Sequence, residues 1–150
     1  MPLDTWREKN DCTMKQTEIK KKLQELGYDL TRVSKGFYMF SSNGTKMLYV
    51  PDSKATECLR FAIPCLYAVT DENKQFLTDI INETNLSVKY AKTLIINQQV
   101  WMIYEYHTSE NEDIEEVITH CLLTLLASQK TFFDLIEGVV AELEEREGAQ

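Results

Sequence analysis

The sequence has few of the residues and runs that mark several classes of protein. Its 150 residues include only 5 glycines and 3 prolines, so long irregular loops are not expected. No apolar run approaches the ~20 residues that a membrane-spanning helix needs, and we expect no membrane partner. Residues 1–13 contain three acids and no apolar core of the signal-peptide type, which favours a cytoplasmic location.

Cysteine and histidine are too few and too scattered to suggest a metal or redox centre. The residues of these two types are Cys12, Cys58, Cys65, Cys121, His107 and His120. No C-x-x-C pair occurs, and three of the four cysteines lie in apolar runs, where a free thiol packs as a small hydrophobe. We therefore predict reduced thiols and no metal site.

Motifs of the common enzyme classes are also absent. The chain has no Walker A loop, dinucleotide-binding glycine loop, nucleophile elbow or H-E-x-x-H helix. His120 and Cys121 are neighbours in one predicted helix, so their side chains point about 100° apart and do not form a dyad. Acid pairs such as Asp113 and Glu116 have the spacing of a solvated helix and no basic partner. We predict no catalytic residues, no cofactor and no enzymatic activity.

Charge is divided unevenly along the chain. Residues 1–60 hold 11 basic and 8 acidic side chains, whereas residues 61–150 hold 5 and 16, and the formal net charge is −8. Because an acidic domain repels phosphate backbones, we predict no nucleic-acid partner. The basic run Lys20–Lys22 lies on a predicted helix with an apolar opposite face, which favours a solvated surface. The acidic C-terminal half suits a partner with a basic or apolar surface.

The first 60 residues predict a helix followed by a strand hairpin. Thr13 is a helix-capping residue, and the helix is expected over Met14–Leu26. Asn43-Gly44 lies between two aromatic-rich runs at residues 37–40 and 47–50. Both turn residues accept positive φ at low cost, so this pair predicts a β-hairpin.

The middle of the chain predicts a strand, a helix and two further strands. The run Leu59–Val69 reads as a strand that Pro64 interrupts, since proline lacks the N–H that a ladder requires. A bulge, an edge position or the end of the strand is expected there. A helix follows over Asp71–Thr84, capped at its first residue or the one before. The runs 88–96 and 100–107 predict strands joined by a turn.

The last region predicts helix from Asn111 onward, with Ser109 as a candidate cap. Apolar residues over Ile114–Leu126 recur at i, i+3, i+4 and i+7. A second apolar set over Phe132–Leu143 keeps helical spacing. We expect a break or kink near Ser128–Thr131, with a single long helix as the alternative.

Together these elements predict an α+β fold in the order α-β-β-β-α-β-β-α, with helices packed on an antiparallel sheet. Residues 1–13 are predicted to form a flexible N-terminal arm and residues 14–147 a single α+β domain. Aromatic residues gather in the strand-like runs, which indicates a sheet core with cross-strand pairs. The alternative is an exposed aromatic sheet face that receives a peptide or helix of a partner.

Four segments between about Leu59 and Ile136 also carry a family resemblance. They are Leu66–Val69 leading into a helix, Asn82–Asn85 with Ser87 and Val88, the hairpin around Asn97–Trp101, and the terminal helix near Phe132-Phe133. With this pattern the chain resembles the YbjN-like family and, through it, the type III secretion chaperone-like fold. The resemblance implies a bacterial α+β domain, often a homodimer, that binds proteins or acts in regulation and is not a catalyst.

We therefore expect a non-enzymatic, cytoplasmic, chaperone-like interaction domain. It would bind a protein partner, or a second copy of itself as a homodimer, through apolar sheet or helix surface. The alternative is a sensory module that binds a small ligand in a pocket between sheet and helices. Neither function requires catalytic, cofactor-binding or metal-ligating residues, and the sequence nominates none.

Overall fold

The computed structural model describes residues 16–33, 36–52, 54 and 57–148. The predicted arm over residues 1–13, with Cys12 and the capping residue Thr13, lies outside these residues. Along the chain come a helix over residues 16–25, β1 (Thr31–Arg32), β2 (Tyr38–Ser42), β3 (Thr45–Tyr49), β4 (Cys58–Ala68), α2 (Lys74–Ser87), β5 (Ala91–Ile96), β6 (Gln99–His107) and α3 (Ile114–Gly148). The predicted α+β class is confirmed, with one strand more than expected.

The strands form one six-stranded sheet in the order β1-β2-β3-β4-β6-β5, and all neighbours are antiparallel. The additional strand is β1, whose two residues are too few to produce an alternating pattern in the sequence. The register aligns residues into rows across the sheet. One row on the face toward the helices is Tyr38, Tyr49, Phe61 and Tyr104. A row on the opposite face is Met39, Leu48, Ala62 and Ile103.

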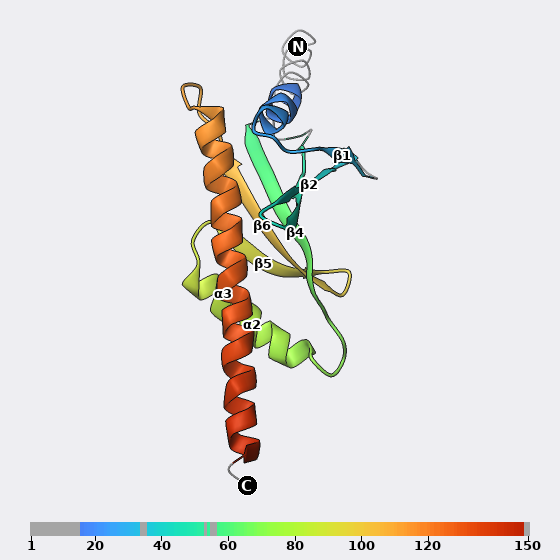
Figure 1. The fold of residues 1–150 in the computed structure, drawn as a ribbon, viewed down its shortest axis with the longest axis vertical. Coiled ribbons are helices and arrows are strands. Elements are labelled where there is room, and N and C mark those ends of the chain that lie inside the picture. Colours follow the sequence, from blue (N-terminus) through green and yellow to red (C-terminus); the bar gives the residue numbers. More distant parts are fainter. Residues whose placement is uncertain (1–15, 34–35, 53, 55–56, 149–150) are drawn as a thin grey trace.

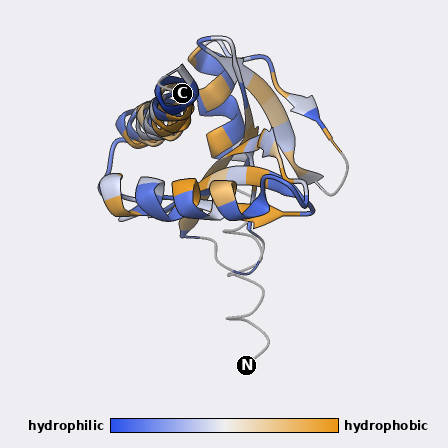
Figure 2. Ribbon diagram, turned by 90° about the horizontal axis from the view of Figure 1, so that it is seen from below, coloured by the Kyte–Doolittle hydropathy of each residue, from blue (hydrophilic) through white to orange (hydrophobic). Residues whose placement is uncertain are grey.

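Both α2 and α3 pack on the same face of the sheet. Leu77 and Ile80 of α2, and Ile118 and Leu125 of α3, are buried in one core cluster with the aromatic row. In Figure 1 α3 runs along the sheet with α2 crossing it, and the view along α3 in Figure 2 shows the sheet on one side of this helix. The prediction that strand aromatics form the core holds on this face.

The expected break in the terminal helix does not occur. Helix α3 is continuous over 35 residues, Ile114–Gly148. The hydroxyl of Ser128 donates to the carbonyl of Thr124 at 2.7 Å, and Thr131 donates to Ala127 at 3.2 Å. These polar side chains satisfy their donors inside the helix, so they do not interrupt it. At the other end Asp113, not Ser109, accepts the N–H of Glu115 at 3.0 Å.

The bounds of α2 also differ from the prediction. The helix begins at Lys74 because Thr70 and Asn73 form a turn in which each accepts the backbone N–H of the other, at 3.2 and 2.8 Å. It continues past Thr84 to Ser87. Thr84 is fully buried and donates to the carbonyl of Ile80 at 2.7 Å, so its polarity does not mark the helix end.

Two turn predictions hold. Asn43 and Gly44 have φ of 51° and 78° in the β2–β3 hairpin. At Pro64 the pairing of β4 with β6 shifts register between Ile63 and Tyr67, which makes the expected bulge, and Cys65 there has φ of 52°. No helix among the described residues has the length and apolar character needed to cross a membrane.

The basic run at residues 20–22 makes more contacts than a solvated face would. Lys22 lies 3.6 Å from the carboxylate of Glu115 at the start of α3. The ammonium of Lys20 lies 4.5 Å from the centre of the Tyr38 ring. These two side chains join the first helix to α3 and to the sheet.

Candidate functional site

The last twelve described residues of α3 form a helical extension in which, among the described residues, only Val139 packs on the core. Ile136 is the last buried residue of the helix, and Val139 is half-buried. Beyond them Val140 is 42% exposed and Leu143 is 50% exposed. Figure 1 shows the C-terminal end of α3 running past the sheet and past α2. We call residues 137–148 the distal segment.

The apolar stripe of α3 continues into this distal segment. Phe132, Ile136, Val139 and Leu143 follow one another at intervals of four, three and four residues, which places them on one face of the helix. The first two pack on the core, whereas Leu143 meets solvent. The remaining surface is acidic, since residues 137–148 contain five glutamates and one arginine. The segment thus presents an apolar stripe within strongly negative surroundings.

The outer face of the sheet, which the described helices leave uncovered, carries a second apolar cluster. Its members are Val33, Phe37, Met39, Leu48, Val50, Ala62, Trp101 and Ile103. Three of them are buried and the other five are half-buried, because they pack against one another. None belongs to the exposed large hydrophobic residues described in this structure. The outer face is therefore a second small core, not the exposed aromatic face considered as an alternative.

A group of charges borders this outer core. Glu105 lies 2.6 Å from the ammonium of Lys92 and 4.0 Å from the guanidinium of Arg60. The hydrogen bond from Lys92 lowers the pKa of Glu105. Arg60 also lies 3.7 Å from Asp52, and burial, with Glu105 nearby, raises the pKa of the Cys58 thiol. This border is a partly exposed set of ion pairs, with a protonated thiol and no activated nucleophile.

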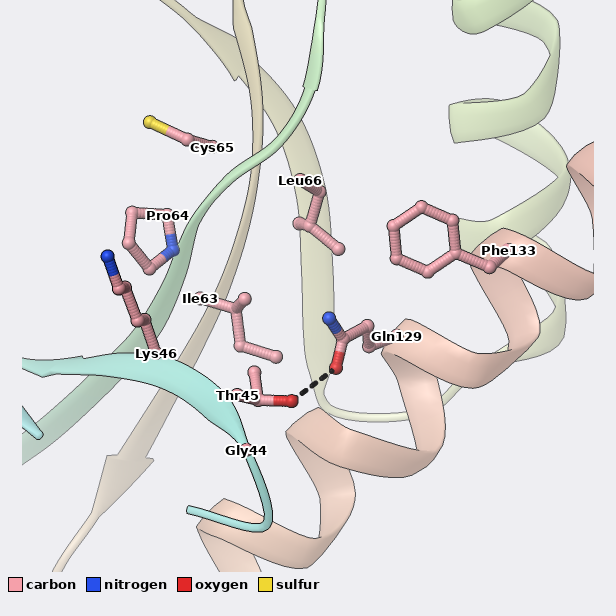
Figure 3. A pocket seen from close by; sticks show the side chains of 9 residues that line it. All are labelled: Gly44, Thr45, Lys46, Ile63, Pro64, Cys65, Leu66, Gln129 and Phe133. Atoms are coloured by element: carbon pink, nitrogen blue, oxygen red, sulfur yellow. Dashed lines mark hydrogen bonds between the residues drawn. The ribbon is translucent and has the colours of Figure 1, made fainter. Parts of the chain in front are cut away.

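A half-open notch of about 510 Å³ lies where the β2–β3 hairpin, the β4 bulge and α3 meet. Nine residues line it: Gly44, Thr45, Lys46, Ile63, Pro64, Cys65, Leu66, Gln129 and Phe133. Thr45 donates a hydrogen bond to the side-chain oxygen of Gln129 at 3.3 Å (Figure 3). One cation and no acid lie among the lining residues.

Three tyrosine rings, those of Tyr90, Tyr104 and Tyr106, lie close to His120 of α3. The Tyr104 hydroxyl lies 2.9 Å from His120 Nε2, and the rings of Tyr90 and Tyr106 are 5.8 and 6.4 Å from the imidazole. Burial raises the pKa of Tyr104 to about 12. The thiol of Cys121 is fully buried, and burial raises its pKa to about 12. His120 thus contacts tyrosines, while Cys121 is a core side chain.

The three described cysteines, Cys58, Cys65 and Cys121, are free thiols. Within the described ranges no group of three or more histidine, cysteine, aspartate or glutamate side chains is placed to hold a metal ion. The notch was not singled out from the sequence. The Pro64 signal marked the bulge, but nothing in the sequence showed which residues would face it.

Comparisons with known proteins bear on the fold. No protein-family model and no curated protein matches the chain. Among solved structures, YbjN from E. coli, described as a candidate transcription regulator, has a TM-score of 0.63 at 8% identity and covers 82% of this chain and 92% of its own. An uncharacterised protein from Methanothermobacter thermautotrophicus has a TM-score of 0.59 at 11% identity and covers 83% and 97%. The chain therefore has a YbjN-like fold, as its sequence resemblance predicts.

Proposed function

We propose that this chain is a non-enzymatic protein-interaction domain that binds a basic amphipathic helix of a partner along the distal segment of α3. The observation that carries the proposal is the continuation of the core stripe into solvent at Leu143, which is 50% exposed, with Val140, three residues earlier in the helix, 42% exposed. An apolar stripe at helical spacing is the surface that helix-in-groove recognition uses.

The distal segment gains little stability from its own sequence. Short helices without tertiary packing are marginal in water, and glutamates near a helix C-terminus oppose the helix dipole. Gly138 lies in the helix interior with ordinary φ and no atom near its Cβ position, so nothing in the fold explains its cost of about 1 kcal/mol relative to alanine. A partner helix packed against Val140 and Leu143 would supply the missing stabilisation.

Charge favours a basic partner over the same segment of a second copy. Two distal segments side by side would bring five glutamates of each against the other, with one arginine apiece. Lysine or arginine flanking the partner's apolar face would remove this repulsion and speed association. A homodimer, which the resemblance implies, would then use another surface.

The described role of YbjN in transcription fits this proposal only through protein contacts. The acidic net charge of this chain, −8, opposes direct binding to a phosphate backbone. We infer that a role of this chain in regulating transcription would act through a bound protein and not through DNA.

Fluorescence anisotropy with a labelled 14-residue Leu/Lys amphipathic peptide tests the proposal. Wild-type protein should bind it, and a Leu/Glu peptide of the same pattern should not bind. The double variant Val140→Ser/Leu143→Ser should raise Kd about tenfold, because two exposed apolar contacts are lost. Leu123→Ser is the matched control, since Leu123 is a 57% exposed residue of α3 outside the distal segment.

Equal weakening in the Leu123→Ser control would show nonspecific attraction to an acidic protein and would contradict the proposal. Light scattering of the pure chain tests the second copy as occupant. A dimer that dissociates in Val140→Ser/Leu143→Ser would overturn the proposal, because the stripe would then be a self-association surface. A monomer, or a dimer that persists in this variant, leaves the stripe free for the partner.

A further inference from the structure

The notch is the place where the β3–β4 ladder stops. These strands pair only at Leu48–Ala62 and Tyr49–Phe61. Continued in the same register, the ladder would set Lys46 opposite Pro64. Because proline has no N–H, it cannot donate to the carbonyl that would face it, and the pairing ends. Beyond Met47 and Ile63, the residues that this register would pair are Gly44–Lys46 and Pro64–Leu66, and all of these line the notch instead.

The walls of the notch are chemically distinct. Leu66 and Phe133 face each other across its helix side, with Ile63 beside them (Figure 3). Gln129 is held by Thr45 through its side-chain oxygen, so its amide nitrogen is directed toward the space between these apolar residues (Figure 3). Lys46 lies beside Pro64 at the opposite rim and is exposed.

The charge of the lining residues determines which sign of ligand the notch can bind. Lys46 is the one charged side chain among the lining residues, on a chain with formal net charge −8. Among the described contacts it takes part in no ion pair, whereas Lys22, Lys92 and Lys130 each have a carboxylate within 4 Å. An available cation at the rim opposite an apolar wall and an amide donor favours an anion with an apolar body.

We infer that the notch binds a carboxylate joined to a short apolar chain, with the carboxylate at Lys46 and the apolar part between Leu66 and Phe133. Its volume of about 510 Å³ is within the range of small-ligand sites. Two sources share this chemistry, a free short-chain carboxylic acid and the C-terminus of a peptide ending in an apolar residue. In the peptide, the preceding carbonyl would accept from the amide of Gln129. The site goes beyond the proposed function, since the distal segment contributes none of its lining residues.

Titrations followed by ¹H–¹⁵N NMR of the full chain test this inference. The probes are 4-methylpentanoate and N-acetyl-Ala-Leu, each compared with its neutral amide. For at least one acid, the chemical shifts of Leu66 and of the Gln129 side chain should change and reach saturation. The matching neutral amide should bind about tenfold more weakly. The acid that binds more tightly identifies the source of the carboxylate.

Two variants and their controls complete the test. Lys46→Gln should weaken binding of the acid about tenfold, whereas Lys130→Gln, which removes the same charge one residue from Gln129, should not. Phe133→Ala should weaken the acid and its amide alike, and Leu123→Ala should weaken neither. The inference is overturned if neither acid shifts the notch resonances, if the amides bind as tightly as the acids, or if Lys130→Gln has the effect expected of Lys46→Gln. NMR spectra of each variant report folding independently of binding.

Discussion

The side chain of Asn85 pairs with the backbone of Thr93 as a neighbouring strand would. Its Oδ1 accepts the Thr93 N–H at 2.8 Å, and its Nδ2 donates to the Thr93 carbonyl at 3.0 Å. Thr93 lies in β5, the edge strand, and Asn85 lies in α2. One amide group thus covers the central donor and acceptor of an edge that would otherwise be open to another chain.

Replacing Asn85 by alanine should lower the free energy of unfolding by about 1–3 kcal/mol, because Thr93 loses both partners in a half-buried setting. The same change should promote concentration-dependent association through the opened β5 edge. Urea denaturation and light scattering measure the two effects. Asn82→Ala is the matched control on the same helix, since Asn82 is exposed and makes no described side-chain hydrogen bond. An equal loss of stability in both variants would contradict the pairing.

The bulge in β4 stores backbone strain at Cys65. Its φ of 52° lies in the left-handed region, which costs a residue with a Cβ about 1–2 kcal/mol, and its side chain is exposed. Cys65→Gly should therefore raise the free energy of unfolding by up to about 1 kcal/mol, after the entropic cost of glycine. Cys65→Val, with a β-branched side chain at the same φ, should lower it. Chemical denaturation of the two variants decides the matter, and a stabilised valine variant would show that no strain is present.

The features of the fold that depend on one or two residues could be predicted from local patterns in the sequence. Asn43-Gly44 predicted the hairpin because both residues adopt positive φ, and they do. Pro64 predicted an interruption because it lacks an N–H, and the β4 register shifts there. These effects act within the chain segment itself, so no tertiary information was needed.

Features that depend on contacts between distant segments were not predictable in this way. The polar run Ser128–Thr131 suggested a helix break, but its hydroxyls bond within the helix. The helix predicted to end at Thr84 continues through Asn85, whose side chain bonds to Thr93, eight residues further along the chain. The exposure of Leu143 reflects where the sheet ends, which the spacing of apolar residues cannot show. The helical spacing of apolar residues in α3 predicts a buried face along its whole length.

Stability should fall in alkaline solution between about pH 9 and 12. Burial raises the pKa of the Cys121 thiol from 9.0 to about 12, and that of the Tyr104 hydroxyl from 10.0 to about 12. Because the unfolded chain then loses these protons first, a rising pH favours unfolding, by at most about 1.4 kcal/mol per pH unit for each group. Below about pH 8 these two groups contribute no pH dependence.

Cys121→Ala isolates one of these groups. The variant should be less stable than the wild type by a constant amount below pH 8, because of the cavity that it leaves. Above pH 9 the difference should narrow, since only the wild type still loses stability through this thiol. Urea denaturation at a series of pH values measures the difference. A gap that stays constant to pH 11 would show that the thiol is not held protonated by burial.

Shortening the chain from its C-terminal end should separate folding from binding. A chain that ends at Ala141 loses Leu143 and the glutamate-rich end but no buried residue, so its free energy of unfolding should change by no more than about 0.5 kcal/mol. A chain that ends at Lys130 also loses Phe132 and Ile136 from the core and should not fold, because truncating one buried phenylalanine already costs about 3–5 kcal/mol. Urea denaturation and circular dichroism measure the stability and the helix content of both shortened chains.

The chain ending at Ala141 should have lost most of its affinity for the Leu/Lys peptide while unfolding at the same urea concentration as the wild type. If it instead unfolds at markedly lower urea, the end of α3 stabilises the folded body and is not a free docking surface.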